Sequence, residues 1–200
     1  MKKLFFLLVF LVSLKAYSQC GVYLTAEDFI AGKLTDEGID IGIPSGPGED
    51  DRVVVTTSHG KKAHKWADVW GYKDNLSYYR ILYGQPMIIV CRGKLIAYTP
   101  YGPIKKTGKN TTYYRKVDGF GEVYVSTDFK NPDGISPVND FSQLWALLDK
   151  SVLQKVKEYY VARTAENESL EATPEQIISF YNSLFPGYVE PTYSVIKVIY

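Results

Sequence analysis

Few residues of this chain have the types and spacing that metal or acid–base chemistry needs. His59 and His64 are its only histidines, and they flank a short turn, with Asp68 four residues further on. A zinc site needs at least three such ligands, but Lys61 and Lys62 lie between the two histidines and would repel a dication. The spacing therefore predicts a solvated strand end here, with no metal and no cofactor.

Two cysteines, Cys20 and Cys91, offer a second kind of chemistry. In an oxidising compartment they could form a disulfide that ties the N-terminal segment to the body of the protein. Cys91 closes the apolar run 87–91, where a buried thiol behaves as a small hydrophobic side chain, so two unrelated thiols are the alternative. An apolar strand is also the wrong setting for a nucleophilic cysteine, which needs an electropositive, partly exposed site.

The carboxylates Glu122, Asp128 and Asp133 could supply an acid pair for a hydrolase. Asp and Asn near Gly and Pro are also ordinary turn residues, which is the simpler interpretation of this loop. We predict no catalytic residue from the sequence and keep the carboxylate pair as the alternative function.

Aromatic residues are the compositional peculiarity, with 17 tyrosines in 200 residues. Neighbouring residues of a strand point to opposite faces, so adjacent tyrosines leave one ring on the outside. Exposed rings on a rigid sheet bind sugars or proteins, whereas half-buried rings only cover a small core. The candidate binding surface consists of Trp66, Trp70, Tyr78, Tyr79, Tyr113 and Tyr114.

The N-terminal residues 1–18 have the pattern of a secretory signal peptide. Lys2 and Lys3 precede an apolar run too short to span a bilayer, and the small residues Ala16 and Ser18 favour cleavage before Gln19. A lipid anchor on Cys20 is the alternative, although the residues before it fit lipoprotein processing poorly. Without the three lysines of residues 1–18 the net charge of +1 becomes −2, which gives no reason to expect a nucleic-acid partner.

The elements that must position these residues indicate an α+β fold in a single domain over 19–200. A β-rich stretch over 50–130 predicts an antiparallel sheet of five or six strands, built from hairpins and partly closed. Its centre should be the pair Met87–Cys91 and Lys94–Tyr98, joined at Arg92-Gly93, with a second hairpin of Thr111–Val117 and Glu122–Thr127. Apolar residues at helical spacing predict two helices over 140–186, the first running from Phe141 to Tyr160 and the second starting at a capping box at Thr173.

Several short segments resemble a family of exported bacterial proteins of unknown function. They are Gly21–Phe29, Val69–Tyr72, Tyr79-Arg80 and Tyr124–Ser126. The resemblance implies export and one β-rich domain, and it brings no catalytic residues. We therefore expect a non-catalytic binding or scaffold protein of the periplasm or cell surface. Its partner would be an envelope protein or a glycan, and the mature chain should have no transmembrane segment.

Overall fold

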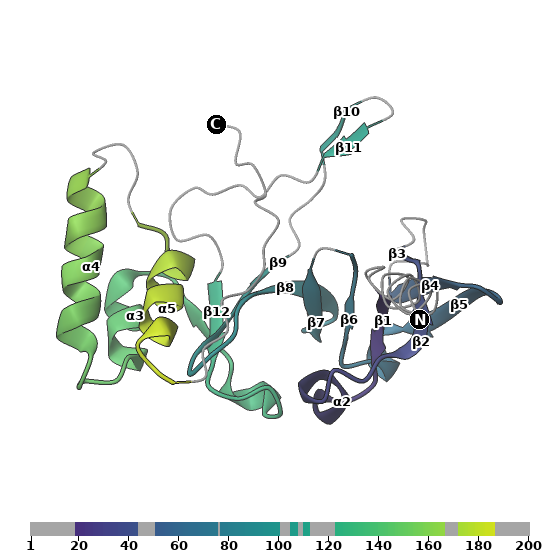
Figure 1. Ribbon diagram of the computed structural model, residues 1–200, viewed down its shortest axis with the longest axis horizontal. Coiled ribbons are helices and arrows are strands. Elements are labelled where there is room, and N and C mark those ends of the chain that lie inside the picture. The colour runs from purple at the N-terminus through teal and green to yellow at the C-terminus, as the bar shows by residue number, and fades with distance from the viewer. Residues whose placement is uncertain are drawn as a thin grey trace, which may run out of the picture. The chain divides into compact units, whose positions relative to one another are not determined.

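The structure is a computed structural model that describes residues 19–43, 51–75, 77–100, 105–107, 110–112, 123–166 and 172–186 (Figure 1). The predicted signal peptide, Tyr113, Tyr114 and Glu122 lie outside these residues. The contacts divide the chain into two compact units, Met1–Tyr78 and Tyr79–Tyr200, and each is described by itself. The single domain over 19–200 stays a prediction.

The described strands confirm the α+β class. They form a large antiparallel sheet of eight strands, a smaller sheet of three strands and a two-stranded ribbon, and the helices α3 to α5 follow at the C-terminal end. The large sheet has more strands than the five or six predicted, and it is open rather than closed among the described residues. None of the described helices is both long and apolar enough to cross a membrane.

The described residues of the first unit form six strands, the first residue of a seventh and two short helices. In chain order these are β1 (Cys20–Tyr23), α2 (Ala26–Ile30), β2 (Thr35–Gly38), β3 (Asp40–Gly42), β4 (Arg52–Thr57), β5 (Gly60–Lys65), the 3₁₀ helix η2 (Trp66–Asp68), β6 (Gly71–Lys73), and the first residue of β7 (Tyr78–Leu82). β1 lies between β2 and β6 in the large sheet, and β3, β4 and β5 form the small sheet in that order. Alternate residues Val53 and Val55 of β4 are fully buried, which gives the small sheet one covered face.

The second unit holds the remainder of the large sheet and the helices. Its elements are the remainder of β7, β8 (Gln85–Cys91), β9 (Ile96–Pro100), β10 (Lys105–Thr107), β11 (Asn110–Thr112), β12 (Val123–Ser126), the 3₁₀ helix η3 (Pro132–Gly134), β13 (Ser136–Val138), α3 (Phe141–Leu147), α4 (Leu153–Glu166) and α5 (Pro174–Ser183). Within this unit the strand order is β13-β12-β9-β8-β7.

The antiparallel pairing of β8 with β9 is confirmed, and so is the position of this pair in the interior of the sheet. Ile89 pairs with Tyr98, and after a bulge at Val90 Cys91 pairs with Ala97. The bulge inserts one residue, so Ile89 and Cys91 face opposite sides of the sheet although they are two positions apart. Both are buried, so both faces of this strand are covered, as the consecutive apolar residues predicted.

Two details of the predicted hairpins are wrong. The β8–β9 connection is the four-residue segment 92–95 rather than the dipeptide Arg92-Gly93. β12 pairs with β9 on one side and β13 on the other. Both of its edges are therefore occupied, and it cannot form the predicted hairpin with the segment that starts at Thr111, whose first two residues belong to β11.

The predicted helix from Phe141 to Tyr160 is broken into α3 and α4, so residues 141–166 and 172–186 form three helices instead of two. The break follows Leu148, whose ψ of 148° is extended, and Asp149 accepts hydrogen bonds at Oδ1 from the backbone N and the hydroxyl of Ser151 at 2.9 and 2.8 Å. The apolar periodicity continues across the break because both helices cover one core. That core joins the helices to Cys91, Ala97, Val123 and Val125 of the sheet.

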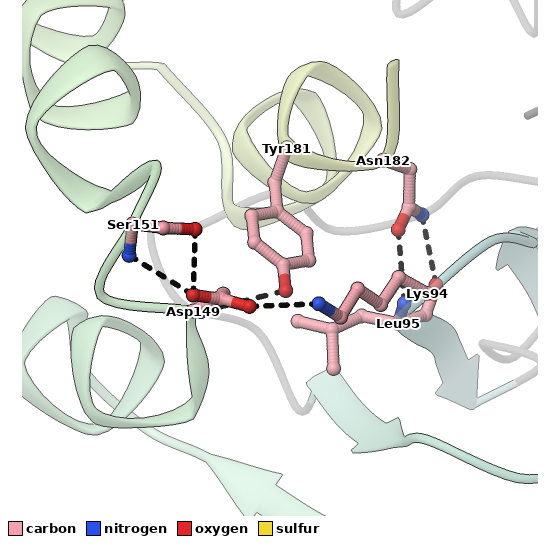
Figure 2. A network of polar contacts seen from close by, with 6 residues as sticks. All are labelled: Lys94, Leu95, Asp149, Ser151, Tyr181 and Asn182. Carbon is pink, nitrogen blue, oxygen red and sulfur yellow. Dashed lines mark hydrogen bonds and ion pairs between the residues drawn. The ribbon is translucent and has the colours of Figure 1, made fainter. Parts of the chain in front are cut away.

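A polar network holds the helices against the β8–β9 connection (Figure 2). Lys94 Nζ donates to Asp149 Oδ2 at 2.8 Å, and the backbone N of Asp149 donates to the hydroxyl of Tyr181 at 3.4 Å. The hydrogen bond from Lys94 and those from Ser151 lower the pKa of Asp149 well below its ordinary value. The α3–α4 connection, α5 and the β8–β9 connection are thereby fixed to one another.

Candidate binding surface

Four aromatic rings from separate segments converge in the first unit. The ring of Phe29 stacks on that of Trp70 with centroids 4.6 Å apart and an interplanar angle of 27°. Tyr23 and Tyr78 meet Phe29 edge to face, at 5.2 and 5.8 Å. These geometries are the ones aromatic pairs prefer. We call Tyr23, Phe29, Trp70 and Tyr78 the Phe29 cluster.

Local structure explains why these rings meet. The hydroxyl of Thr25 accepts a hydrogen bond from the backbone N of Asp28 and caps α2, which turns Phe29 back towards the end of β1. Antiparallel pairing of β1 with β6 sets Tyr23 opposite Gly71, and the backbone N of Trp70 donates to the carbonyl of Tyr23 at 2.9 Å. The cluster is therefore fixed by a helix cap and a strand register.

The cluster combines a buried base with a partly exposed rim. Tyr23 and Phe29 are buried, whereas Trp70 and Tyr78 are half-buried. The residues next to the buried pair in the chain are large, apolar and solvent-exposed: Leu24 at 43% and Ile30 at 59%. Aromatic side chains such as Trp and Tyr are enriched in the cores of protein–protein interfaces.

The other residues of the predicted aromatic surface lie elsewhere. Trp66 is half-buried in η2, and its indole N–H is buried without a hydrogen-bond acceptor among the described residues. Tyr79 belongs to the second unit and is buried, with 5% exposure, so its ring is not part of an exposed surface. Of the six predicted residues, the structure brings Trp70 and Tyr78 together, and Tyr113 and Tyr114 are outside the described residues.

Cys20 and Cys91 are both buried free thiols in the structure. The disulfide between them, one of the two possibilities that the sequence left open, stays untested. The thiol of Cys20 donates to Asn75 Oδ1 at 3.2 Å in the first unit. That of Cys91 donates to the carbonyl of Glu175 at 3.4 Å in the second unit. Burial raises the pKa of Cys20, with a further contribution from the nearby carboxylates, so this thiol is kept protonated and unreactive.

The histidine segment forms an ion-pair cluster. His64 Nε2 lies 3.1 Å from Asp36 Oδ2, and Lys62 donates to the other oxygen of the same carboxylate. The hydrogen bond from Lys62 lowers the pKa of Asp36. His59 is exposed at the turn, and no group of three or more ligating side chains gathers among the residues that the structure describes.

The carboxylates proposed for a hydrolase occupy turns. Asp128 is exposed, and its Oδ1 accepts from the backbone N of Lys130 at 2.8 Å. Asp133 is exposed in η3, where its own backbone N donates to Asn131 Oδ1. These two side chains therefore match ordinary turn residues, and Glu122 lies outside the described residues.

A buried polar chain in the second unit had no signal in the sequence. Arg80 is 3% exposed, and its Nη1 donates to the hydroxyl of Tyr98 at 2.9 Å. That hydroxyl lies 3.1 Å from Ser126 Oγ, which donates to the carbonyl of Asp128 at 3.0 Å. Because arginine only donates and Ser126 uses its proton on the carbonyl, the Tyr98 proton must point to Ser126. Burial raises the pKa of Tyr98, which keeps this hydroxyl protonated.

The helices carry a second group of stacked rings. Phe141 and Trp145 are one helical turn apart in α3 and stack with centroids 5.4 Å apart, and Tyr160 of α4 lies 4.6 Å from Phe141. All three are partly buried and pack against the core of the second unit. We interpret this group as the outer layer of the core.

Comparison of the chain with family models, with curated proteins and with solved structures found no match.

Proposed function

We propose that the chain is exported and acts as a non-catalytic binding or scaffold protein of the bacterial envelope. The Phe29 cluster is the observation that carries this proposal. Its half-buried rings, Trp70 and Tyr78, rest on the buried ring of Phe29, so they are held rigidly and lose little conformational entropy on binding.

The residues that follow the two buried rings in the chain favour a partner protein over a glycan. Leu24 and Ile30 are large, apolar and exposed, whereas sugar sites combine a ring with several polar groups that bind hydroxyls. A polar group does lie near the cluster, since Lys73 Nζ is 5.8 Å from the Tyr78 ring centroid. Large apolar residues at the surface are stabilised when a partner protein removes them from water. We therefore propose an apolar partner surface as the ligand of the Phe29 cluster.

The binding test uses affinity capture from envelope extract with the Leu24→Ser/Ile30→Ser double variant. We expect the wild-type chain to retain a partner that the variant loses, because the variant removes exposed apolar contacts without opening the core. Ile39→Ser/Leu147→Ser is the matched control, since these residues are 70% and 40% exposed and lie outside the cluster. Equal capture by all three proteins, or no capture by any, would contradict the proposal. If the wild-type chain instead binds a glycan array and Leu24→Ser/Ile30→Ser does not, the ligand of the cluster is a sugar and not a protein.

Export is tested separately by intact mass and N-terminal sequencing of the processed chain. The expected first residue is Gln19, produced by cleavage after the small residue Ser18. A lipid-modified Cys20 as the first residue would contradict cleavage before Gln19 and place the chain on a membrane.

A further inference from the structure

A second surface of the first unit is defined by charge. Residues 52–67 contain Arg52, Lys61, Lys62 and Lys65 and no acidic residue, in a chain whose 23 basic residues nearly balance its 22 acidic ones. The segment folds into the hairpin of β4 and β5. The four basic residues of this segment are therefore carried by the β4–β5 hairpin.

The strand register separates these basic residues onto two faces. Directly opposite residues of an antiparallel pair share a face, and successive residues alternate. Lys62 lies opposite the buried Val55, and His64 lies opposite the buried Val53. Both side chains contact the carboxylate of Asp36 on that inner face, so the positive charge of Lys62 already has a partner there.

The outer face presents Arg52, Lys61 and Lys65, which we call the basic face. Arg52 is directly opposite Lys65, an arrangement in which like charges destabilise a sheet. Lys61 lies four residues from Lys65 on the same strand, about 13 Å away at the usual rise of a β-strand. Arg52 and Lys65 therefore lie side by side at one end of the hairpin, and Lys61 lies on the same face towards its other end.

Acidic neighbours only partly neutralise the basic face. Asp51 Oδ1 lies 3.8 Å from Arg52 Nε, and Asp40 of β3 lies opposite Thr56 on the same face. Lys61 and Lys65 are exposed and have no ion-pair partner among the residues described. The surplus positive charge is thus on β5, at the end of the strand order in the small sheet.

We propose that the basic face binds an acidic polysaccharide, whose carboxylate or sulfate groups follow β5 from Lys61 to Lys65. A linear polymer with repeated negative charges matches cations spaced along a strand, here Lys61 and Lys65 of β5 with Arg52 beside Lys65. The residues between the cations on this face are Val54, Thr56 and Ala63, which offer no large apolar side chain for insertion into a lipid surface. They also offer no aromatic ring on which nucleic-acid bases could stack.

Lysines on an edge strand have another known role, which is to prevent strand addition by a second molecule. Under that explanation, removal of Lys61 and Lys65 would cause self-association and leave polysaccharide binding unchanged. The two explanations therefore differ in what the same variant does.

The test measures binding of the full chain in its processed form to dextran sulfate and to polygalacturonate by isothermal titration calorimetry at low and high salt. We expect binding to both acidic polymers, weakening as salt screens the charges, and no binding to neutral dextran. Lys61→Gln/Lys65→Gln should weaken binding roughly tenfold or more, since it removes two of the three cations of the face. Lys155→Gln/Lys157→Gln changes the net charge equally at two exposed positions of α4 and should bind like the wild type.

Four results would overturn the inference. Two concern the paired variants: both double variants bind as tightly as the wild type, or both bind equally weakly. The third is self-association of Lys61→Gln/Lys65→Gln with unchanged polysaccharide binding. The fourth is tighter binding of the wild type to phosphatidylglycerol vesicles or to poly(dT) than to either polysaccharide. The inference and the proposed function both assume that the chain is exported, but they concern different residues of the first unit. The Leu24→Ser/Ile30→Ser variant should keep its polysaccharide binding, so failure of one surface is distinguishable from failure of the other.

Discussion

The side-chain amide of Asn182 in α5 pairs with both backbone polar groups of Leu95 (Figure 2). The backbone N of Leu95 donates to Asn182 Oδ1 at 2.9 Å, and Asn182 Nδ2 donates to the carbonyl of Leu95 at 2.8 Å. Asn182 is fully buried, so water cannot replace either bond. A residue of the last helix thus satisfies the backbone of a sheet connection 87 positions earlier in the chain.

Replacement of Asn182 by Leu should lower the free energy of unfolding by about 2–4 kcal/mol, because the N–H and C=O of Leu95 would remain buried without partners. Urea denaturation followed by circular dichroism measures the change. Ser183→Ala is the control, since Ser183 is exposed on the same helix and its hydroxyl donates locally to the carbonyl of Phe180. A loss no larger for Asn182→Leu than for Ser183→Ala would contradict the role assigned to this amide.

Gly93 is required by the close approach of the same amide. A Cβ at position 93 would lie 2.5 Å from Asn182 Cγ and 2.8 Å from its Nδ2. We expect Gly93→Ala to cost about 1–3 kcal/mol through this overlap. In an Asn182→Ala background the contacts with Cγ and Nδ2 disappear and only the 2.8 Å contact with Cβ remains, so Gly93→Ala should cost less there. A double-mutant cycle from urea denaturation measures the difference, and strictly additive costs would show that the two residues do not interact.

The sequence was sufficient to predict features that depend on neighbouring residues, but not those that depend on distant ones. The capping box at Thr173 and the buried strand 87–91 are local patterns, and they appear in the structure as predicted. The break at Asp149 was missed because the apolar periodicity continues through it. The pairing of Asn182 with Leu95, the position of Arg80 beside Tyr98 and the convergence of Trp70 and Tyr78 on Phe29 depend on strand order and register. No single segment encodes those.

Asp36 gives the first unit a pH dependence at acid pH. The hydrogen bond from Lys62 lowers the pKa of Asp36 in the folded state. A carboxyl group whose pKa is lower when folded stabilises the protein above its unfolded pKa of about 3.9 and loses that contribution as the pH falls through the folded value. We therefore expect the gap in melting temperature between the wild type and Asp36→Asn to be present at pH 6 and to shrink below pH 4. A gap independent of pH would show that this carboxylate is not stabilised by its partners. Asp133→Asn is the control, because Asp133 is exposed and its side chain has no ion-pair partner among the described residues.

Ile89 marks the centre of the second unit. It is 3% exposed and pairs with the fully buried Tyr98. Ile89→Lys should lower the free energy of unfolding by about 3–5 kcal/mol, since a charge without a partner would be buried. Ile39→Lys makes the same chemical change at a residue that is 70% exposed, and should cost at most about 0.5 kcal/mol. Thermal and urea denaturation of both variants measures this, and similar midpoints would show that Ile89 is not in the core.

The Tyr98 hydroxyl supports the buried charge of Arg80, so its removal should cost more than an ordinary hydrogen bond. Tyr98→Phe keeps the ring under the guanidinium, whose Cζ lies 5.5 Å from the ring centroid, and removes only the acceptor and the bond to Ser126. We expect a loss of about 2–3 kcal/mol, because a hydrogen bond to a charged group is lost inside the protein. Ser126→Ala leaves the acceptor of Arg80 in place and removes the neutral hydrogen bonds that Ser126 makes with Tyr98 and with the carbonyl of Asp128, so it should cost only about 1 kcal/mol.

The wild type should also lose stability above pH 10 relative to Tyr98→Phe, since burial raises the pKa of Tyr98 and the tyrosine of the unfolded chain ionises first. Urea denaturation of the three proteins at pH 7 and pH 10.5 measures both effects, and an equal cost for the two variants at pH 7 would show that Arg80 does not depend on this hydroxyl.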